Sequence, residues 1–114
     1  MRPPPVEIDR ESLRRRLEDG SELVLVDALA PLSYAARHLP GAINITPARV
    51  DELAGSQIPD LDTEIVVYCA DAGCDASVEV AQRLIELGYR NVRHYSGGKR
   101  DWADAGLPFE GGRI

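Results

Sequence analysis

Two cysteines joined by a loop of small residues are the clearest sign of chemistry in this chain. Cys69 ends the apolar run 65–69, and Cys74 follows five positions later. The run is typical of a strand buried on both faces. A loop between a strand and a helix can turn its backbone N–H groups toward one point, and both this cradle and the helix N-terminus would favour the reactive thiolate of Cys69. We therefore predict that Cys69 is a nucleophile; the alternative is a small hydrophobic core residue.

The predicted cradle lies between Cys69 and the following helix. It consists of Ala70, Asp71, Ala72, Gly73, Asp75, Ala76 and Ser77. Cys74 lies in the same loop and is a candidate resolving thiol, because it could convert an oxidised or persulfidated Cys69 into an internal disulfide. Spacing alone does not fix the geometry of a disulfide. A second thiol that only packs under the loop therefore stays an open alternative.

Three other polar residues are candidates for the same site. Asp27 ends the apolar run 23–27, and we expect it to support the site by hydrogen bonding to nearby backbone rather than by acid–base chemistry. His38 precedes a Pro-Gly turn and is predicted to be a structural turn residue. His94 lies in a strand-like run. Whether its side chain packs in the core or faces the site stays open. The two cysteines lack the second ligand pair of a zinc site, so no metal is predicted.

The hydrophobic pattern predicts alternating strands and helices. We expect strands at 23–27, 42–45, 65–69 and 92–95, and helices at 10–19, 31–37, 47–53, 76–87 and around Trp102. This order indicates an α/β fold, a parallel sheet with helices on both faces. Sites in such sheets form beyond the carboxyl ends of the strands, which is where Asp27 and Cys69 fall.

Length and composition limit the class of protein. The 114 residues are enough for one domain, expected at 8–114 after an extended lead-in at 1–7 that contains three prolines. A net charge of −6 argues against nucleic-acid binding. No apolar stretch is long enough for a membrane span, and the N-terminus has no secretory signal. With only two cysteines, we expect a cytoplasmic location. A monomer is the default expectation for the oligomeric state.

Several motifs together resemble single-domain rhodaneses over about residues 8–112. They are LVD at 25–27, YAARHLPGAIN at 34–44, VVYC at 66–69, the segment 81–89, SGG at 96–98 and WADAGLP at 102–108. The resemblance implies a five-stranded parallel sheet and a sulfurtransferase. In that family the cysteine at position 69 takes a sulfane sulfur from thiosulfate or a persulfide and holds it as a persulfide. It then passes the sulfur to cyanide or a thiol, without a cofactor; a sulfur-relay protein is a further expected partner.

The chain departs from the family pattern at two places. The segment from Cys69 to Ser77 is two residues longer than the common loop and contains no arginine, while Asp71 and Asp75 are acidic. Leu29 stands where many members have an arginine. Both changes remove bidentate anion recognition, so we expect thiosulfate to be a poor donor. Two alternatives stay open: a non-catalytic protein-binding module, and a Cys69/Cys74 thiol–disulfide switch.

Overall fold

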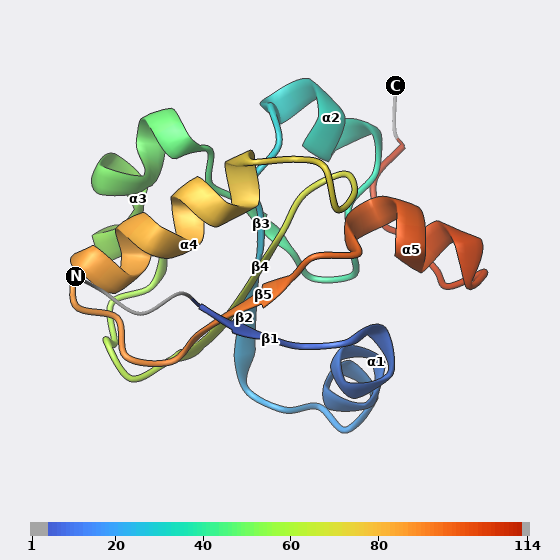
Figure 1. Cartoon of the computed structure of the whole chain (residues 1–114), viewed down its shortest axis with the longest axis horizontal. Coiled ribbons are helices and arrows are strands. Elements are labelled where there is room, and N and C mark those ends of the chain that lie inside the picture. Colours follow the sequence, from blue (N-terminus) through green and yellow to red (C-terminus); the bar gives the residue numbers. More distant parts are fainter. Residues whose placement is uncertain (1–4, 113–114) are drawn as a thin grey trace.

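The chain folds as a parallel five-stranded sheet between two layers of helices (Figure 1). The computed structural model describes residues 5–112. The strands are β1 (Val6–Glu7), β2 (Leu23–Asp27), β3 (Ile43–Asn44), β4 (Glu64–Tyr68) and β5 (Val92–Tyr95). The helices are α1 (Arg10–Glu18), α2 (Pro31–Ala36), α3 (Val50–Gln57), α4 (Ala76–Glu86) and α5 (Gly98–Asp104). The predicted α/β class, with helices on both faces of a parallel sheet, is confirmed.

The strand order β1-β5-β4-β2-β3 places β4 at the centre. Every residue of β4 is buried, as the continuous apolar run predicts for Ile65 to Tyr68; the buried Glu64 precedes that run. Residues in β4 alternate between the two faces, so Val67 contacts one core and Val66 the other. The sheet is therefore buried on both faces at its centre.

The two helical layers divide the core into two clusters. Helices α3 and α4 cover one face, where Ala54 and Leu84 pack against the sheet, and α1 and α5 cover the other, where Leu13 and Trp102 do so (Figure 1). The short helix α2 lies beyond the carboxyl end of β2. This arrangement leaves the edge formed by the carboxyl ends of β2, β4 and β5 as the place where loops from several elements meet.

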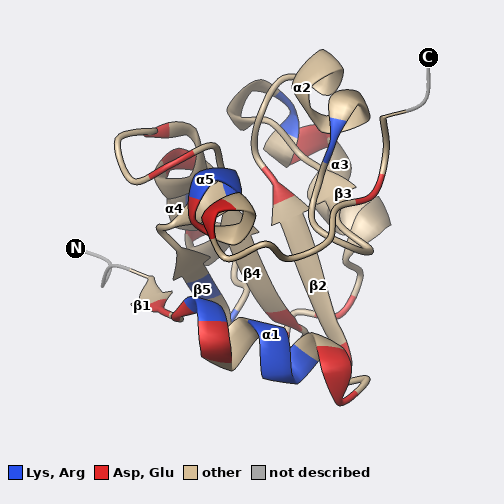
Figure 2. Ribbon diagram, turned by 90° about the vertical axis from the view of Figure 1, so that its right-hand side faces the viewer, with Lys and Arg blue, Asp and Glu red and all other residues tan. Residues whose placement is uncertain are grey.

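Helix α1 has the predicted start and end. The Asp9 side chain accepts a 2.7 Å hydrogen bond from the Ser12 N–H, which caps the helix, and Gly20 follows it with a positive φ of 71°. The helix carries both basic and acidic residues along its length (Figure 2). One of its arginines, Arg16, forms an ion pair with the buried Glu64 at the start of β4. This pair ties α1 to the amino end of the sheet, opposite the cysteine loop.

Two expectations from the sequence differ from the structure. The helix expected at 47–53 begins as a 3-10 turn, Pro47–Arg49, and continues as α3 to Gln57. The lead-in 1–7 contains a strand, because Val6–Glu7 pairs with β5 in parallel and forms one edge of the sheet. A strand of two residues has no periodicity to read, and its partner lies far away in the sequence. Residues 1–4 lie outside the described part of the chain.

No helix within residues 5–112 is long and apolar enough to cross a membrane.

Candidate active site

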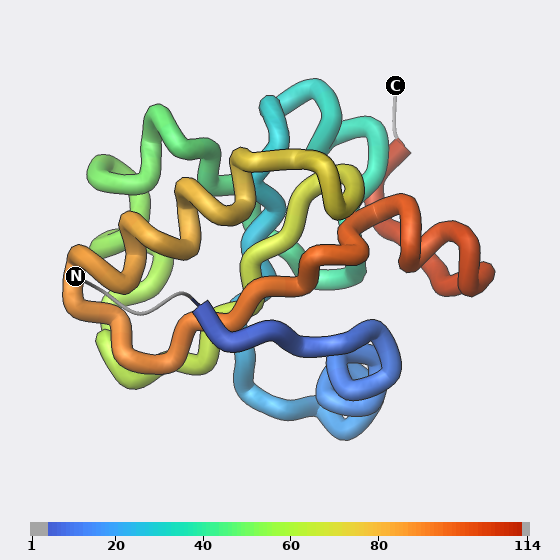
Figure 3. Tube along the Cα trace, in the orientation of Figure 1, coloured from blue at the N-terminus to red at the C-terminus, as the bar shows by residue number. Residues whose placement is uncertain are grey.

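The cysteine loop leaves the carboxyl end of β4 and rests on the start of α5. Figure 3 shows the loop after β4 lying against the first turn of α5. The backbone N–H of Lys99 donates a 3.0 Å hydrogen bond to the Cys69 carbonyl, and the N–H of Arg100 donates a 2.8 Å bond to the Ala70 carbonyl. The beginning of α5 therefore fixes the first two residues of the loop.

Cys69 and Cys74 are joined by a disulfide bond, with their Cα atoms 6.3 Å apart. Cys69 is 1% exposed, whereas Cys74 is half-buried in the loop. Asp71 accepts hydrogen bonds from the backbone N–H groups of Gly73 (3.0 Å, at the carboxylate) and Cys74 (3.2 Å, at the carbonyl). The N–H of Gly73, which belongs to the predicted cradle, and the N–H of Cys74 are thus used within the loop while the disulfide is closed.

The rest of the predicted loop joins the cysteines to α4. Ala72 and Asp75 are exposed, and Asp75 occupies the N-cap position of α4 without a side-chain capping bond. Ala76 and Ser77 form the first turn of the helix, and Ser77 is buried. The loop side chains that face solvent therefore include two carboxylates, Asp71 and Asp75.

A chain of polar side chains leads away from the Cys69 sulfur. Ser77 Oγ lies 3.2 Å from Cys69 Sγ and 2.8 Å from Nε2 of His94. On its other side, Nδ1 of His94 lies 2.7 Å from a carboxylate oxygen of Glu7 in β1. His94 faces the cysteine loop and not only the core. The sequence analysis left open whether His94 packs or faces the site, and no sequence signal pointed to Glu7.

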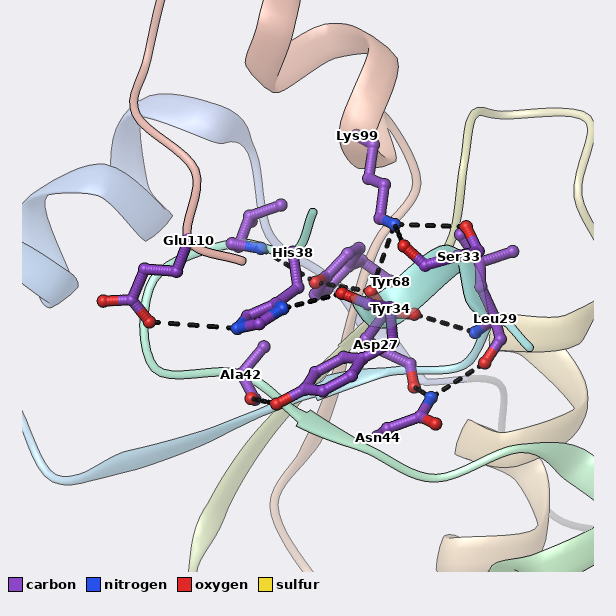
Figure 4. Close-up of polar contacts among 11 residues, drawn as sticks. Asp27, Leu29, Ser33, Tyr34, His38, Ala42, Asn44, Tyr68, Lys99 and Glu110 are labelled. Atoms are coloured by element: carbon purple, nitrogen blue, oxygen red, sulfur yellow. Dashed lines mark hydrogen bonds and ion pairs between the residues drawn. The ribbon is translucent and has the colours of Figure 1, made fainter. Parts of the chain in front are cut away.

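Asp27 lies at the centre of a second polar cluster, shown in Figure 4. Its buried carboxylate accepts a 2.8 Å hydrogen bond from the Leu29 N–H and a 2.9 Å bond from the Tyr68 hydroxyl. Its carbonyl accepts a 3.0 Å bond from the Asn44 side chain. The carboxylate thus supports the backbone beyond β2 and touches neither cysteine through these bonds.

Lys99 supplies the cation of this cluster. Its ammonium lies 3.5 Å from the Asp27 carboxylate and donates a 2.9 Å hydrogen bond to the Ser33 carbonyl (Figure 4). Burial lowers the pKa of Lys99, while the Asp27 carboxylate opposes that shift. The sequence analysis did not single out Lys99. Its spacing of three from the buried Trp102 on a short helix would have indicated that it faces inward.

A cavity of about 420 Å³ opens beside this cluster and the start of the cysteine loop. Arg37, Lys99 and Arg100 line it together with Ala70 and Asp71. The loop itself contains no arginine, but α5 and the end of α2 contribute Lys99, Arg100 and Arg37 to the lining. Figure 2 shows basic residues in both of these elements. The cavity therefore has a mixed charge, which the loop sequence alone did not reveal.

His38 has structural contacts. Its Nδ1 lies 2.8 Å from the Tyr34 carbonyl, its ring stacks on Tyr34 with centroids 4.0 Å apart, and Nε2 lies 3.9 Å from Glu110 (Figure 4). The backbone of His38 also pairs with Glu110 in an isolated bridge. These contacts hold the segment after α5 against α2. Within residues 5–112, no cluster of three or more His, Cys, Asp or Glu could hold a metal ion.

Alkaline pH should destabilise the fold through its tyrosines, Tyr68 above all. Burial, and then the Asp27 carboxylate, hold the pKa of Tyr68 above its usual value of 10.0. The unfolded chain therefore loses this proton first. The contribution of Tyr68 to stability is fully present below pH 10 and falls above it by ~1.4 kcal/mol per pH unit. At pH 10.5, four tyrosines of ordinary pKa would together give about three tyrosinates. Absorbance should therefore show clearly fewer than about three while circular dichroism is still native. About three tyrosinates in a folded protein would contradict this expectation.

The geometry places the chain among α/β domains in which a strand–cysteine loop–helix unit faces a cavity at the carboxyl edge of a parallel sheet. Residues 9–105 match the Rhodanese-like domain family. The chain is 35% identical over 102 residues to a sulfurtransferase of Allochromatium vinosum, with 90% of this chain and 92% of that protein covered. It is also 38% identical over 109 residues to an HTH-type transcriptional regulator of Mycobacterium tuberculosis, covering 92% of this chain and 45% of the regulator.

Solved structures agree with this assignment. The fold superposes on a human single-domain sulfurtransferase with a TM-score of 0.74 and 27% sequence identity, covering 86% of this chain and 95% of the human one. The chain belongs to the Rhodanese-like domain family.

Proposed function

We propose that the protein is a sulfurtransferase that carries a sulfane sulfur as a persulfide on Cys69. The observation that carries the proposal is the position of Cys69: at the end of the central strand, against the first N–H groups of α5 and next to an open cavity. Two of the relatives above are named sulfurtransferases. The proposed donor is a small sulfane-sulfur compound, and the acceptor is a thiol or a sulfur-relay protein.

The proposed reaction needs no cofactor. The Cys69 thiolate attacks the sulfane sulfur of the donor, the sulfur–sulfur bond of the donor breaks, and a thiolate or sulfite leaves with the bonding electrons. A thiolate or cyanide acceptor then attacks the outer sulfur of the Cys69 persulfide. This second step releases the acceptor persulfide or thiocyanate and restores the Cys69 thiolate.

The charge around the cavity supports a persulfide donor over thiosulfate. Arg37 and Arg100 are opposed at the cavity wall by Asp71 and Asp104, and Lys99 is engaged by Asp27. A dianion gains little in such a mixed field. We expect a small thiol persulfide to load Cys69 faster than thiosulfate does.

The disulfide favours a second candidate function, a thiol–disulfide switch. The two ideas are connected, because the Cys74 thiolate can attack the inner sulfur of a Cys69 persulfide, form the observed disulfide and release hydrogen sulfide as its anion. A switch alone would instead need an external oxidant. The product of disulfide formation, released sulfide or none, distinguishes the two functions.

Intact mass spectrometry of the reduced protein tests the sulfur carrier. After incubation with glutathione persulfide, Cys74→Ser should gain one sulfur atom that cyanide removes, and Cys69→Ser should gain no cyanide-labile sulfur. The wild type should load and then close its disulfide with release of sulfide. If reduced Cys74→Ser with an alkylatable Cys69 takes sulfur from neither persulfide nor thiosulfate, the sulfurtransferase proposal is wrong and the switch is favoured.

A further inference from the structure

We propose that Glu7, His94 and Ser77 form a directional proton relay that removes the proton of the Cys69 thiol. The inference rests on the proposed function, in which Cys69 must act as a thiolate. Its basis is the unbroken contact chain from Cys69 Sγ to Ser77 (3.2 Å), from Ser77 to His94 (2.8 Å) and from His94 to Glu7 (2.7 Å). Three different elements contribute these residues, since Ser77 lies in α4, His94 in β5 and Glu7 in β1.

The direction of the relay follows from what each group can donate. An ionised Glu7 carboxylate can only accept, so Nδ1 of a neutral His94 must carry its hydrogen. Nε2 is then a lone pair, and the Ser77 hydroxyl must donate to it. The oxygen of Ser77 is left with lone pairs for the Cys69 sulfur. A reduced Cys69 can therefore donate its S–H to Ser77, and the chain points from sulfur to imidazole.

The proton step conserves charge and needs no outside reagent. Once the disulfide has been reduced, the Cys69 S–H gives its proton to Ser77 Oγ as the Ser77 proton passes to Nε2 of His94. The products are a thiolate and an imidazolium that is paired with the Glu7 carboxylate. Ser77 touches the reacting sulfur, while His94 and Glu7 act through it as positioning residues.

Burial limits proton transfer from Cys69 to this chain of side chains. Ser77 is 1% and His94 8% exposed, so water has little access to the middle of the chain, whereas the Glu7 side chain is 57% exposed and can exchange protons with solvent. The relay thus connects a buried sulfur to the open edge of the sheet.

The charged groups around this region have other contacts. The Lys99 ammonium points at Ser33 and Asp27, and Arg100 and Asp71 line the cavity. Asp75 is exposed at the start of α4. Among the described residues, Glu7 is the charged group in hydrogen-bond contact with His94.

The tautomer of His94 gives a first test that needs no variant. Nitrogen NMR of the ¹⁵N-labelled wild type, reduced and at a pH where the ring is neutral, should show the hydrogen on Nδ1. A hydrogen on Nε2 would make His94 the donor to Ser77, which reverses the chain and overturns the relay.

The rate at which iodoacetamide alkylates Cys69, measured against pH in the reduced Cys74→Ser background, gives the functional test. His94→Gln and Ser77→Ala should lower the rate at pH 7 by about tenfold and move the midpoint upward by about one pH unit. Glu7→Gln, at an exposed position, should shift it in the same direction by less. His38→Gln, which removes a histidine bonded to a backbone carbonyl, is the matched control and should leave the profile unchanged.

Each outcome separates the relay from sulfur transfer. Unchanged alkylation profiles in folded His94→Gln and Glu7→Gln proteins would show that these residues only pack, even if Cys69 still loads sulfur. Shifted profiles support the relay even if no donor loads Cys69, because alkylation reports the thiolate and not the sulfur transfer.

Discussion

Gly98→Ala is expected to lower the free energy of unfolding by about 3 kcal/mol and to remove sulfur loading at Cys69. Gly98 has a φ of +63°, which costs a residue with a Cβ about 1–2 kcal/mol. A Cβ at this position would also lie 2.5 Å from the Cys69 carbonyl oxygen and 2.9 Å from the Ala70 carbonyl carbon. Both are backbone atoms, so α5 and the cysteine loop must separate.

Substitutions at two other glycines, measured by urea unfolding, separate the backbone cost of a positive φ from the steric cost of the added Cβ. Gly106→Ala has a similar φ of +72° with no atom within 4 Å of its Cβ, so it should cost only the backbone term, about 1–2 kcal/mol. Gly55→Ala lies in α3 with an ordinary φ and open space, and should stabilise by up to about 1 kcal/mol. If Gly98→Ala costs no more than Gly106→Ala, the close contact between α5 and the loop does not constrain the site.

The secondary structure was predictable where the hydrophobic pattern is local and strong. The runs that became β2 and β4 are continuous and apolar, and the Asp9 cap and Gly20 stop bounded α1 correctly. The edge strand β1 was not predictable, because two residues carry no period and their pairing with β5 depends on a contact 87 positions away. The same long-range pairing brings Glu7 to His94. The sequence analysis therefore missed the edge strand and the Glu7–His94 contact for the same reason.

The site was predictable in position but not in its polar surroundings. The rule that sites lie beyond the carboxyl ends of parallel strands placed Asp27 and Cys69 at one edge, where the structure has both. The charge of the cavity was not predictable from the loop, because Lys99 and Arg100 arrive from a different element. Only the complete fold brings α5 over the cysteine loop.

Lys99→Met is expected to lower the free energy of unfolding by about 3 kcal/mol, because it leaves the Asp27 carboxylate buried without its cation. The Asp27 carboxylate is fully buried and keeps only the bonds from Leu29 and Tyr68 after the change. Methionine fills a similar volume, so the loss reports charge rather than packing. Urea unfolding at pH 7 measures it.

The double variant Asp27→Asn/Lys99→Met identifies the cause of that loss. If the cost comes from an uncompensated charge, neutralising Asp27 should recover part of it, and the double variant should be more stable than the sum of the single changes predicts by about 2 kcal/mol. The exposed pair Arg90–Asp62, 2.6 Å apart, is the matched control, and Arg90→Met should cost less than about 1 kcal/mol. Equal costs for Lys99→Met and Arg90→Met would show that the Asp27–Lys99 pair is as weak as a solvent-screened one. Lys99 would then be free to turn its ammonium from Asp27 toward an anionic donor in the cavity, which would weaken the argument for a persulfide donor over thiosulfate.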